Sequence, residues 1–306
     1  MKTVIRLAGI LILLWAAGLA DDAQENQADH AVVSFSNPAK PGTVEVDISQ
    51  GSITVRGYEG KDVIIDARWR ERVLTREEKE DEEQAVAALA EAEEQVDQQE
   101  LARKKAQAEK AKGMKKLEVE SMGLSVEEEE NVIQVSAEEG KRAVDLTIQV
   151  PYSASLRLSC SDDERGITVE GVSGEIEVES SDGPIVLINV SGPVVADSSD
   201  GEIKAVFGKV TPGKPMSFSA MDGDIDITLP ADVKASLKMK TDEGQIFTDF
   251  DIRLTPSQQK KEEDERKEGG GYRVAFEKAT LGLINGGGVE IQLTTSEGNI
   301  YVRKAM

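Results

Sequence analysis

Acidic side chains recur at one position of a repeated tight turn, where neighbouring carboxylates could hold a cation or act as a catalytic pair. Asp182, Asp200 and Asp222 each precede a glycine, and Asp242 occupies a related turn. Stacked turns can converge several oxygens on Ca²⁺, and paired carboxylates can transfer protons. The turn alone also explains these residues, because Asp caps a turn through its own side chain. The Gly-Gly-led calcium repeat is not matched, so we assign this column no metal-binding or catalytic residue, and calcium binding stays open.

Other residues that commonly carry chemistry are scarce. His30 is the only histidine and lies in a predicted N-terminal tail, which removes histidine-based triads and histidine metal sites. Cys160 is the only cysteine and ends an alternating apolar run, so we predict a small buried side chain without a disulfide. The run 286–288 lacks the Lys and Ser/Thr of a phosphate-binding loop and predicts a turn before a strand. We predict no catalytic, cofactor-binding or metal-binding residues and no enzyme activity, while Ser-Lys or carboxylate-pair chemistry stays open.

The elements that would position these residues repeat along the chain. A turn ending in Gly precedes a short β-rich run, as in GITVEG, GEIEVES, GEIKAVF and GDIDITL. Every second glycine recurs after 17 or 18 residues, from Gly166 to Gly183 to Gly201, which fits two short strands and two turns per coil. We expect the turn glycines to supply a positive φ.

Apolar and polar residues alternate within each run, which is typical of a strand with one buried face. We predict a mainly β fold, a right-handed β-helix or solenoid-like stack of short strands with one inserted charged α-helix. An antiparallel sandwich of hairpins would use the same turns, but the recurrence of one phrase favours the solenoid. The predicted inward column is Ile167/Val169, Ile176/Val178, Ile185/Leu187, Val194/Ala196, Ile203/Ala205, Ile225/Ile227, Ile246 and Ile300/Val302.

The N-terminal segment has the pattern of an export signal. Lys2 and Arg6 precede an apolar run that ends at Ala20 and is too short for a comfortable membrane span. We predict a signal peptide over residues 1–20, cleaved after Ala20, with an uncleaved anchor as the alternative. The mature protein would then be exported, to the periplasm or the cell surface, and soluble.

A charged segment interrupts the β pattern between predicted N-terminal strands at 21–74 and a predicted β-solenoid domain at 117–306. Thr75 and Glu78 form a capping-box signature, and the acidic first half and basic second half of the segment complement a helix dipole. We predict an inserted charged helix over 75–116. Its apolar stripe is sparse, so it is either a solvated helix that lies partly on the scaffold or, through 75–112, a coiled-coil contact for a partner or a second copy; the stripe is Val86, Leu89, Val96 and Leu101.

Three smaller features complete the organisation of the chain. The like charges at 127–130 predict a turn, and the charged, Gly-ended run at 258–271 predicts a mobile loop. Arg303 and Lys304 are expected to blunt the exposed edge of a terminal coil.

The overall charge restricts the partners. The net charge is −22 at pH 7, which leaves no basic stripe for phosphates and argues against nucleic acid and against direct binding to an anionic membrane. Aromatic residues make up only 4% of the chain, so the aromatic platforms that sugar-binding proteins commonly use are scarce.

The repeated region resembles a known family. Its Val150-Pro151 entry, its serial Gly-x-Ile strands, its Leu229-Pro230 step and a closing glycine-led pair of strands up to Ile300 are similar to the bacterial "putative adhesin" family, a domain of unknown function. The resemblance covers roughly 150–302 and implies an exported β-solenoid without established catalytic residues. The insertion at 75–116 departs from the family pattern.

These observations predict a non-enzymatic, exported β-solenoid protein of the cell envelope that acts as an adhesin or binding scaffold. The alternative is a β-helix enzyme that acts on polysaccharide. The outward residues Glu175, Glu177 and Asp224 are acidic and lack a basic cluster beside them, which favours the scaffold. The expected partner is an unknown envelope protein or a surface glycan, and no cofactor is expected.

Overall fold

The computed structural model describes residues 28–71, 123–137, 142–161, 165–255, 259–264, 272–277 and 279–305. The predicted signal peptide and the predicted helix at 75–116 lie outside these ranges. The described part of the chain is built from strands and turns, and it holds no helix long and apolar enough to cross a membrane.

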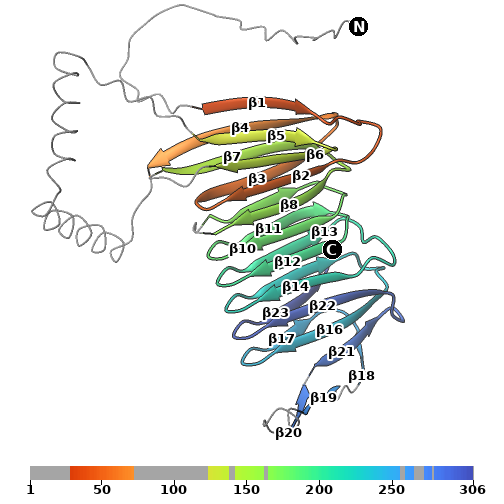
Figure 1. Ribbon diagram of the computed structural model, residues 1–306. Coiled ribbons are helices and arrows are strands. Elements are labelled where there is room, and N and C mark those ends of the chain that lie inside the picture. Colours follow the sequence, from red (N-terminus) through yellow and green to blue (C-terminus); the bar gives the residue numbers. More distant parts are fainter. Residues whose placement is uncertain are drawn as a thin grey trace, which may run out of the picture.

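Two large sheets lie face to face and run the length of the molecule (Figure 1). Sheet A has the order β1 (Ala28–Ser34), β4 (Asp62–Glu71), β7 (Arg142–Pro151), β3 (Gly51–Tyr58), β9 (Ile167–Glu170), β11 (Ile185–Val190), β13 (Ile203–Phe207), β15 (Ile225–Leu229), β23 (Ile300–Lys304) and β17 (Ile246–Thr248). Sheet B has the order β18 (Arg253–Thr255), β21 (Thr280–Ile284), β16 (Ala235–Thr241), β22 (Val289–Thr295), β14 (Met216–Ala220), β12 (Val194–Ser198), β10 (Ile176–Ser180), β8 (Ser155–Cys160), β2 (Thr43–Ile48), β6 (Val132–Ala137) and β5 (Leu124–Glu129).

Each repeat forms one coil, with a strand in sheet B, a tight turn and a strand in sheet A. Successive coils pair in parallel and in register, so that Ile176 lies opposite Val194 in sheet B and Ile185 lies opposite Ile203 in sheet A. Antiparallel pairs occur only towards the ends of the two large sheets, for example between β4 and β7 and between β16 and β21. The mostly parallel pairing agrees with a solenoid-like stack and is inconsistent with the antiparallel sandwich.

The core is the double layer of apolar side chains between the two sheets. The alternating burial of the strands confirms the predicted inward column, since all its members except Ile246 are buried; Ile246 is partly buried on the last strand of sheet A. Outward residues such as Glu177 and Lys204 are exposed. Ile and Val fill this thin core because their branched side chains suit a pleated surface.

The order of the coils in space differs from their order in sequence. The coil β2–β3 lies between β6–β7 and β8–β9, and the coil β22–β23 lies between β14–β15 and β16–β17. The edge prediction for Arg303 and Lys304 is therefore wrong. Their strand β23 pairs on both sides, with Ile300 opposite both Ile225 and Ile246, and the edge of sheet A is β17.

Two predicted irregular segments contain strands. Within 258–271, β19 (Gln259–Asp264) pairs antiparallel with β20 (Tyr272–Glu277), so the loop prediction needs correction over those residues. Within 127–130, the first three glutamates belong to β5, and the turn sits at Glu130 and Asn131, where φ is 51° and 71°. The sequence of β19 lacks the apolar alternation that predicts a strand, and in β5 the alternation of Leu124 and Val126 gives way to three glutamates.

Most of the repeat glycines do not have the predicted positive φ, although Gly166 does, with a φ of 59°. Gly201, Gly223 and Gly298 are not among the residues with positive φ. Instead, a Cβ on Gly223 would overlap the carbonyl oxygen of Gly201, and a Cβ on Gly298 would overlap that of Gly223. Glycine is required because the backbones of successive coils come too close for any side chain.

Candidate functional site

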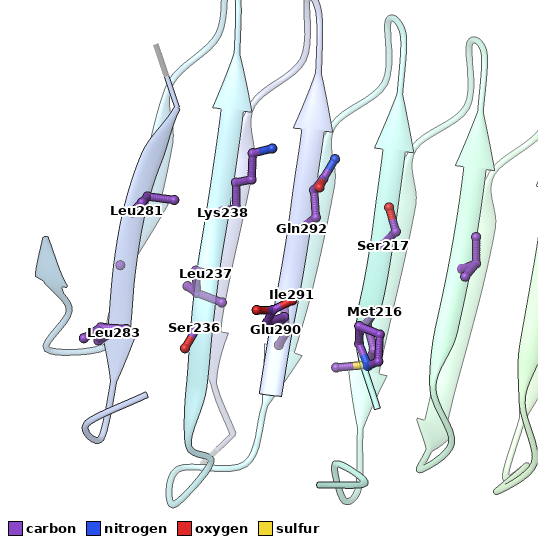
Figure 2. A pocket seen from close by; sticks show the side chains of 13 residues that line it. Met216, Ser217, Ser236, Leu237, Lys238, Leu281, Leu283, Glu290, Ile291 and Gln292 are labelled. Atoms are coloured by element: carbon purple, nitrogen blue, oxygen red, sulfur yellow. The ribbon is translucent and has the colours of Figure 1, made fainter. Parts of the chain in front are cut away.

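A groove crosses the outer face of sheet B near one end of the stack, over β12, β14, β22, β16 and β21. Figure 2 shows Ser217, Gln292 and Lys238 along one line across the strands, with Glu290 and Ser236 along a second line. The two lines are rows of outward side chains, because residues two apart on a strand share a face. They form the walls of a groove with a volume of about 590 Å³.

The register of the strands explains each wall. Ser217 pairs with Gln292, Gln292 with Lys238, and Lys238 with Leu281, so these four form one row. Ser236 pairs with both Glu290 and Leu283 in the second row. The residues between the rows point inward and present only backbone to the groove, which makes them its floor: Met216, Ile291, Leu237 and Gly282.

The groove is apolar at its ends and polar in its middle. Leu281 and Leu283 stand at one end, and Val195 and Pro215 stand at the other. In between, the side chains of Ser217, Gln292, Lys238 and Glu290 make no hydrogen bond or ion pair with other residues of the described ranges. These groups can therefore exchange bound water for a ligand without breaking a contact within the protein.

The acidic turns of successive coils stack beside one another. The Asp200 amide donates to the Ser181 carbonyl at 2.8 Å, and the Asp222 amide donates to Ser199 at 2.9 Å, so backbone hydrogen bonds join the turns. The turn of Glu297 lies between those of Asp222 and Asp242. Among the described residues, no three His, Cys, Asp or Glu side chains gather as a metal ion would need.

A buried column of hydroxyl groups supports these turns, and the sequence reasoning missed it. Thr295 Oγ1 accepts from the Gly298 amide at 3.2 Å and donates to the carbonyl of Gly223 in the adjacent coil at 3.0 Å. Thr241 repeats the pattern with Gly244 and Gly298 at 2.9 Å each. The sequence signal was a Ser or Thr three positions before Gly183, Gly201, Gly244 and Gly298, whereas Ala220 takes that place before Gly223.

Cys160 occupies the same column. It pairs in register with Ser180, and its thiol donates to the Gly51 carbonyl at 3.1 Å, as Thr295 does to Gly223. The side chain is buried, as predicted. It is more than a small hydrophobe, because its S–H replaces a hydroxyl in an inter-coil hydrogen bond.

His30 is not in a tail. It lies in β1, and its Nδ1 is 2.7 Å from Asp66 Oδ1 on β4. Both side chains are exposed, and the pair lies at the opposite end of the stack from the groove (Figure 1). The structure does not bring His30 together with the acidic turns. The run 286–288 does form the predicted turn, between β21 and β22.

Ionic contacts on the outer faces join neighbouring coils near β1. Asp145 accepts from Arg165 through both carboxylate oxygens, at 2.7 and 2.6 Å, and from Ser52 Oγ at 2.9 Å. Partial burial acts to raise the pKa of Asp145, but the hydrogen bonds from Arg165 and Ser52 and the charges of Arg165 and Arg70 outweigh it, so the pKa lies below its ordinary value. Arg157 likewise bridges Glu45 and Glu177 on adjacent strands of sheet B.

Two comparisons with known proteins found similarities. A family model described as Toastrack DUF4097 matches residues 163–303. A solved structure described as a "putative cell adhesion protein" from Clostridium sporogenes is similar over 91% of this chain and 100% of its own, with 8% identity and a TM-score of 0.45. No curated protein matches the chain.

Proposed function

Given that residues 163–303 are a toastrack DUF4097 domain, we propose that this protein is a non-enzymatic, exported component of the cell envelope that acts as an adhesin or binding scaffold. Its expected partner is an envelope protein or a surface glycan. The observation that carries the proposal is the groove of sheet B, with its unpaired polar groups held on a stack of parallel coils.

The groove favours binding over catalysis. Among the described residues that line the groove, Glu290 is the only carboxylate. Glycoside hydrolysis commonly needs two carboxyl groups that flank the scissile bond, so the polysaccharide-acting alternative has one group too few in this groove. Its rows rest on paired strands, which suits the presentation of a fixed surface.

The proposal includes features outside the described residues. The basic and apolar pattern of residues 1–20 supports export with cleavage after Ala20, and right-handed winding of the coils follows the general preference of parallel crossovers. The helix over 75–116 would contact a partner or lie solvated beside the stack.

The export proposal is tested by sequencing the N-terminus of the protein from the native envelope. Protein from the native envelope should begin at Asp21 on N-terminal sequencing, and an intact Met1 in that material would overturn export with cleavage.

The binding proposal is tested by capture. Immobilised mature protein should retain an envelope component that the variant Ser217→Trp does not retain, because the tryptophan fills the groove. Equal retention by both would show that the groove is not the binding site. Release of reducing sugar ends from envelope polysaccharide would favour the enzyme.

A further inference from the structure

We propose that the groove on sheet B binds a neutral, linear glycan lying across the strands, parallel to the axis of the stack. This inference rests on the proposed function and specifies its ligand. Three properties of the groove support it: the spacing of its polar side chains, a floor whose backbone groups are already paired, and its balance of charge.

The first property is a polar side chain on each successive strand. Ser217, Gln292 and Lys238 lie in one register row on β14, β22 and β16. Neighbouring strands are ~4.8 Å apart, which is close to the length of one pyranose unit in an extended chain. Each sugar can therefore meet a new hydrogen-bonding side chain in the same position.

The second property is a floor without free main-chain groups. Strand β22 pairs with β14 on one side and with β16 on the other, and β16 pairs with β21 beyond it. Extended peptides are commonly captured by the open backbone of an edge strand. The floor offers no free backbone group, so a ligand must be held by side chains. This suits a glycan, which is rich in hydroxyl groups.

The third property is the balance of charge. Lys238 faces the groove from one wall and Glu290 from the other, and the protein carries a net charge of −22. A polyanion would meet Glu290 and the general negative field. A neutral chain meets one positive donor, Lys238, and one negative acceptor, Glu290, and both can hydrogen-bond to hydroxyls.

The apolar ends complete the fit. Leu281 and Leu283 at one end and Val195 and Pro215 at the other can pack against the C–H faces of sugar rings. From β12 to β21 the groove crosses four strand spacings, roughly 19 Å, which suits about four sugar units. None of the described residues that line it is aromatic, so binding should be weak for an isolated site.

The experiment titrates the full mature chain with cellotetraose, chitotetraose and xylotetraose by calorimetry. At least one should bind, and its dimer should bind more weakly because it leaves strands uncontacted. Gln292→Ala and Lys238→Ala should each weaken binding about threefold to tenfold, the value of one hydrogen bond. Lys204→Ala, an exposed lysine on sheet A, is the matched control and should leave binding unchanged.

Several outcomes would overturn the inference. Binding of none of the tetrasaccharides would do so, as would tighter binding of a tetragalacturonate or of an extended peptide. An exposed aromatic pair on sheet A, Phe247 stacked on Tyr301 with centroids 5.2 Å apart, provides a competing surface. Loss of binding in Phe247→Ala but not in Gln292→Ala would place the glycan there. Capture of an envelope component that survives these failures would leave the broader proposed function standing.

Discussion

Single residues hold this fold through close backbone contact more than through side-chain chemistry. The glycine column allows each coil to approach the next, and the hydroxyl column beside it joins the Gly298 and Gly223 backbones through Thr295. Cys160 shows that the column accepts a thiol as donor. The stability of a coil is therefore shared with its neighbours at these positions, as in other stacked repeats.

Gly223→Ala should be strongly destabilising, because its Cβ would overlap the carbonyl of Gly201, which cannot move without separating two coils. We expect a loss of about 3 kcal/mol in the free energy of unfolding. Gly213→Ala is the control: its φ is 73° but no atom lies near its Cβ, so it should lose about 1 kcal/mol. Denaturant melts measure both, and equal losses would contradict the close-approach explanation.

The Asp145 cluster should make stability depend on acid. Its pKa is depressed in the folded state, so its contribution is present above the unfolded pKa, about 3.9, and is lost as pH falls through the lower folded value. Thermal midpoints of the wild type and of Asp145→Asn should differ near neutral pH and converge as the pH falls through the lowered folded pKa. A difference that persists unchanged in acid would show that the carboxylate charge is not involved.

At the scale of elements, the sequence predicts which face of each strand is buried, but it does not predict which strands pair with each other. The inward position of Ile225 follows from local alternation, which any single run displays. The choice of neighbour is different, because every run with Gly-x-Ile presents the same inward face and could pair with any other. Nothing local to Ile300 says that it lies between Ile225 and Ile246.

The groove was missed for a related reason. Its wall combines Ser217, Gln292 and Lys238 from three separate runs, and only the register of the coils places them in one row. No spacing along the chain could have brought them together in advance. The acidic turns, in contrast, were visible as a motif, although their stacking yields no metal cluster among the described residues.

Removal of the coil β22–β23 should disrupt one end of the stack. A chain truncated after Asn285 leaves β14 and β16 without the strand that joins them. We expect a lower thermal midpoint and a broader transition. Deletion of residues 28–34, which removes the edge strand β1, is the control and should cost less because β1 pairs only with β4. Equal effects in circular dichroism melts would argue against the observed coil order.

At the scale of the whole molecule, the buried residues of the described strands and turns form one cluster between the two sheets. We therefore expect that replacing residues 75–116 with a short Gly-Ser linker keeps the β signal in circular dichroism and removes any helical signal. Collapse of the β signal would show that the segment belongs to the core, and retained helical signal would contradict the helix prediction.

The coil order also has a consequence for biosynthesis. The ribosome makes β16 and β17 before β22 and β23, yet the earlier pair packs outside the later one. A nascent chain can add most coils as they emerge, each onto a finished neighbour, but β16 cannot join the stack until β22 has been made, because β22 lies between β14 and β16. This end of the molecule is thus completed in one late step, and a chaperone or the translocation machinery would meet an unfinished apolar surface there until that step occurs.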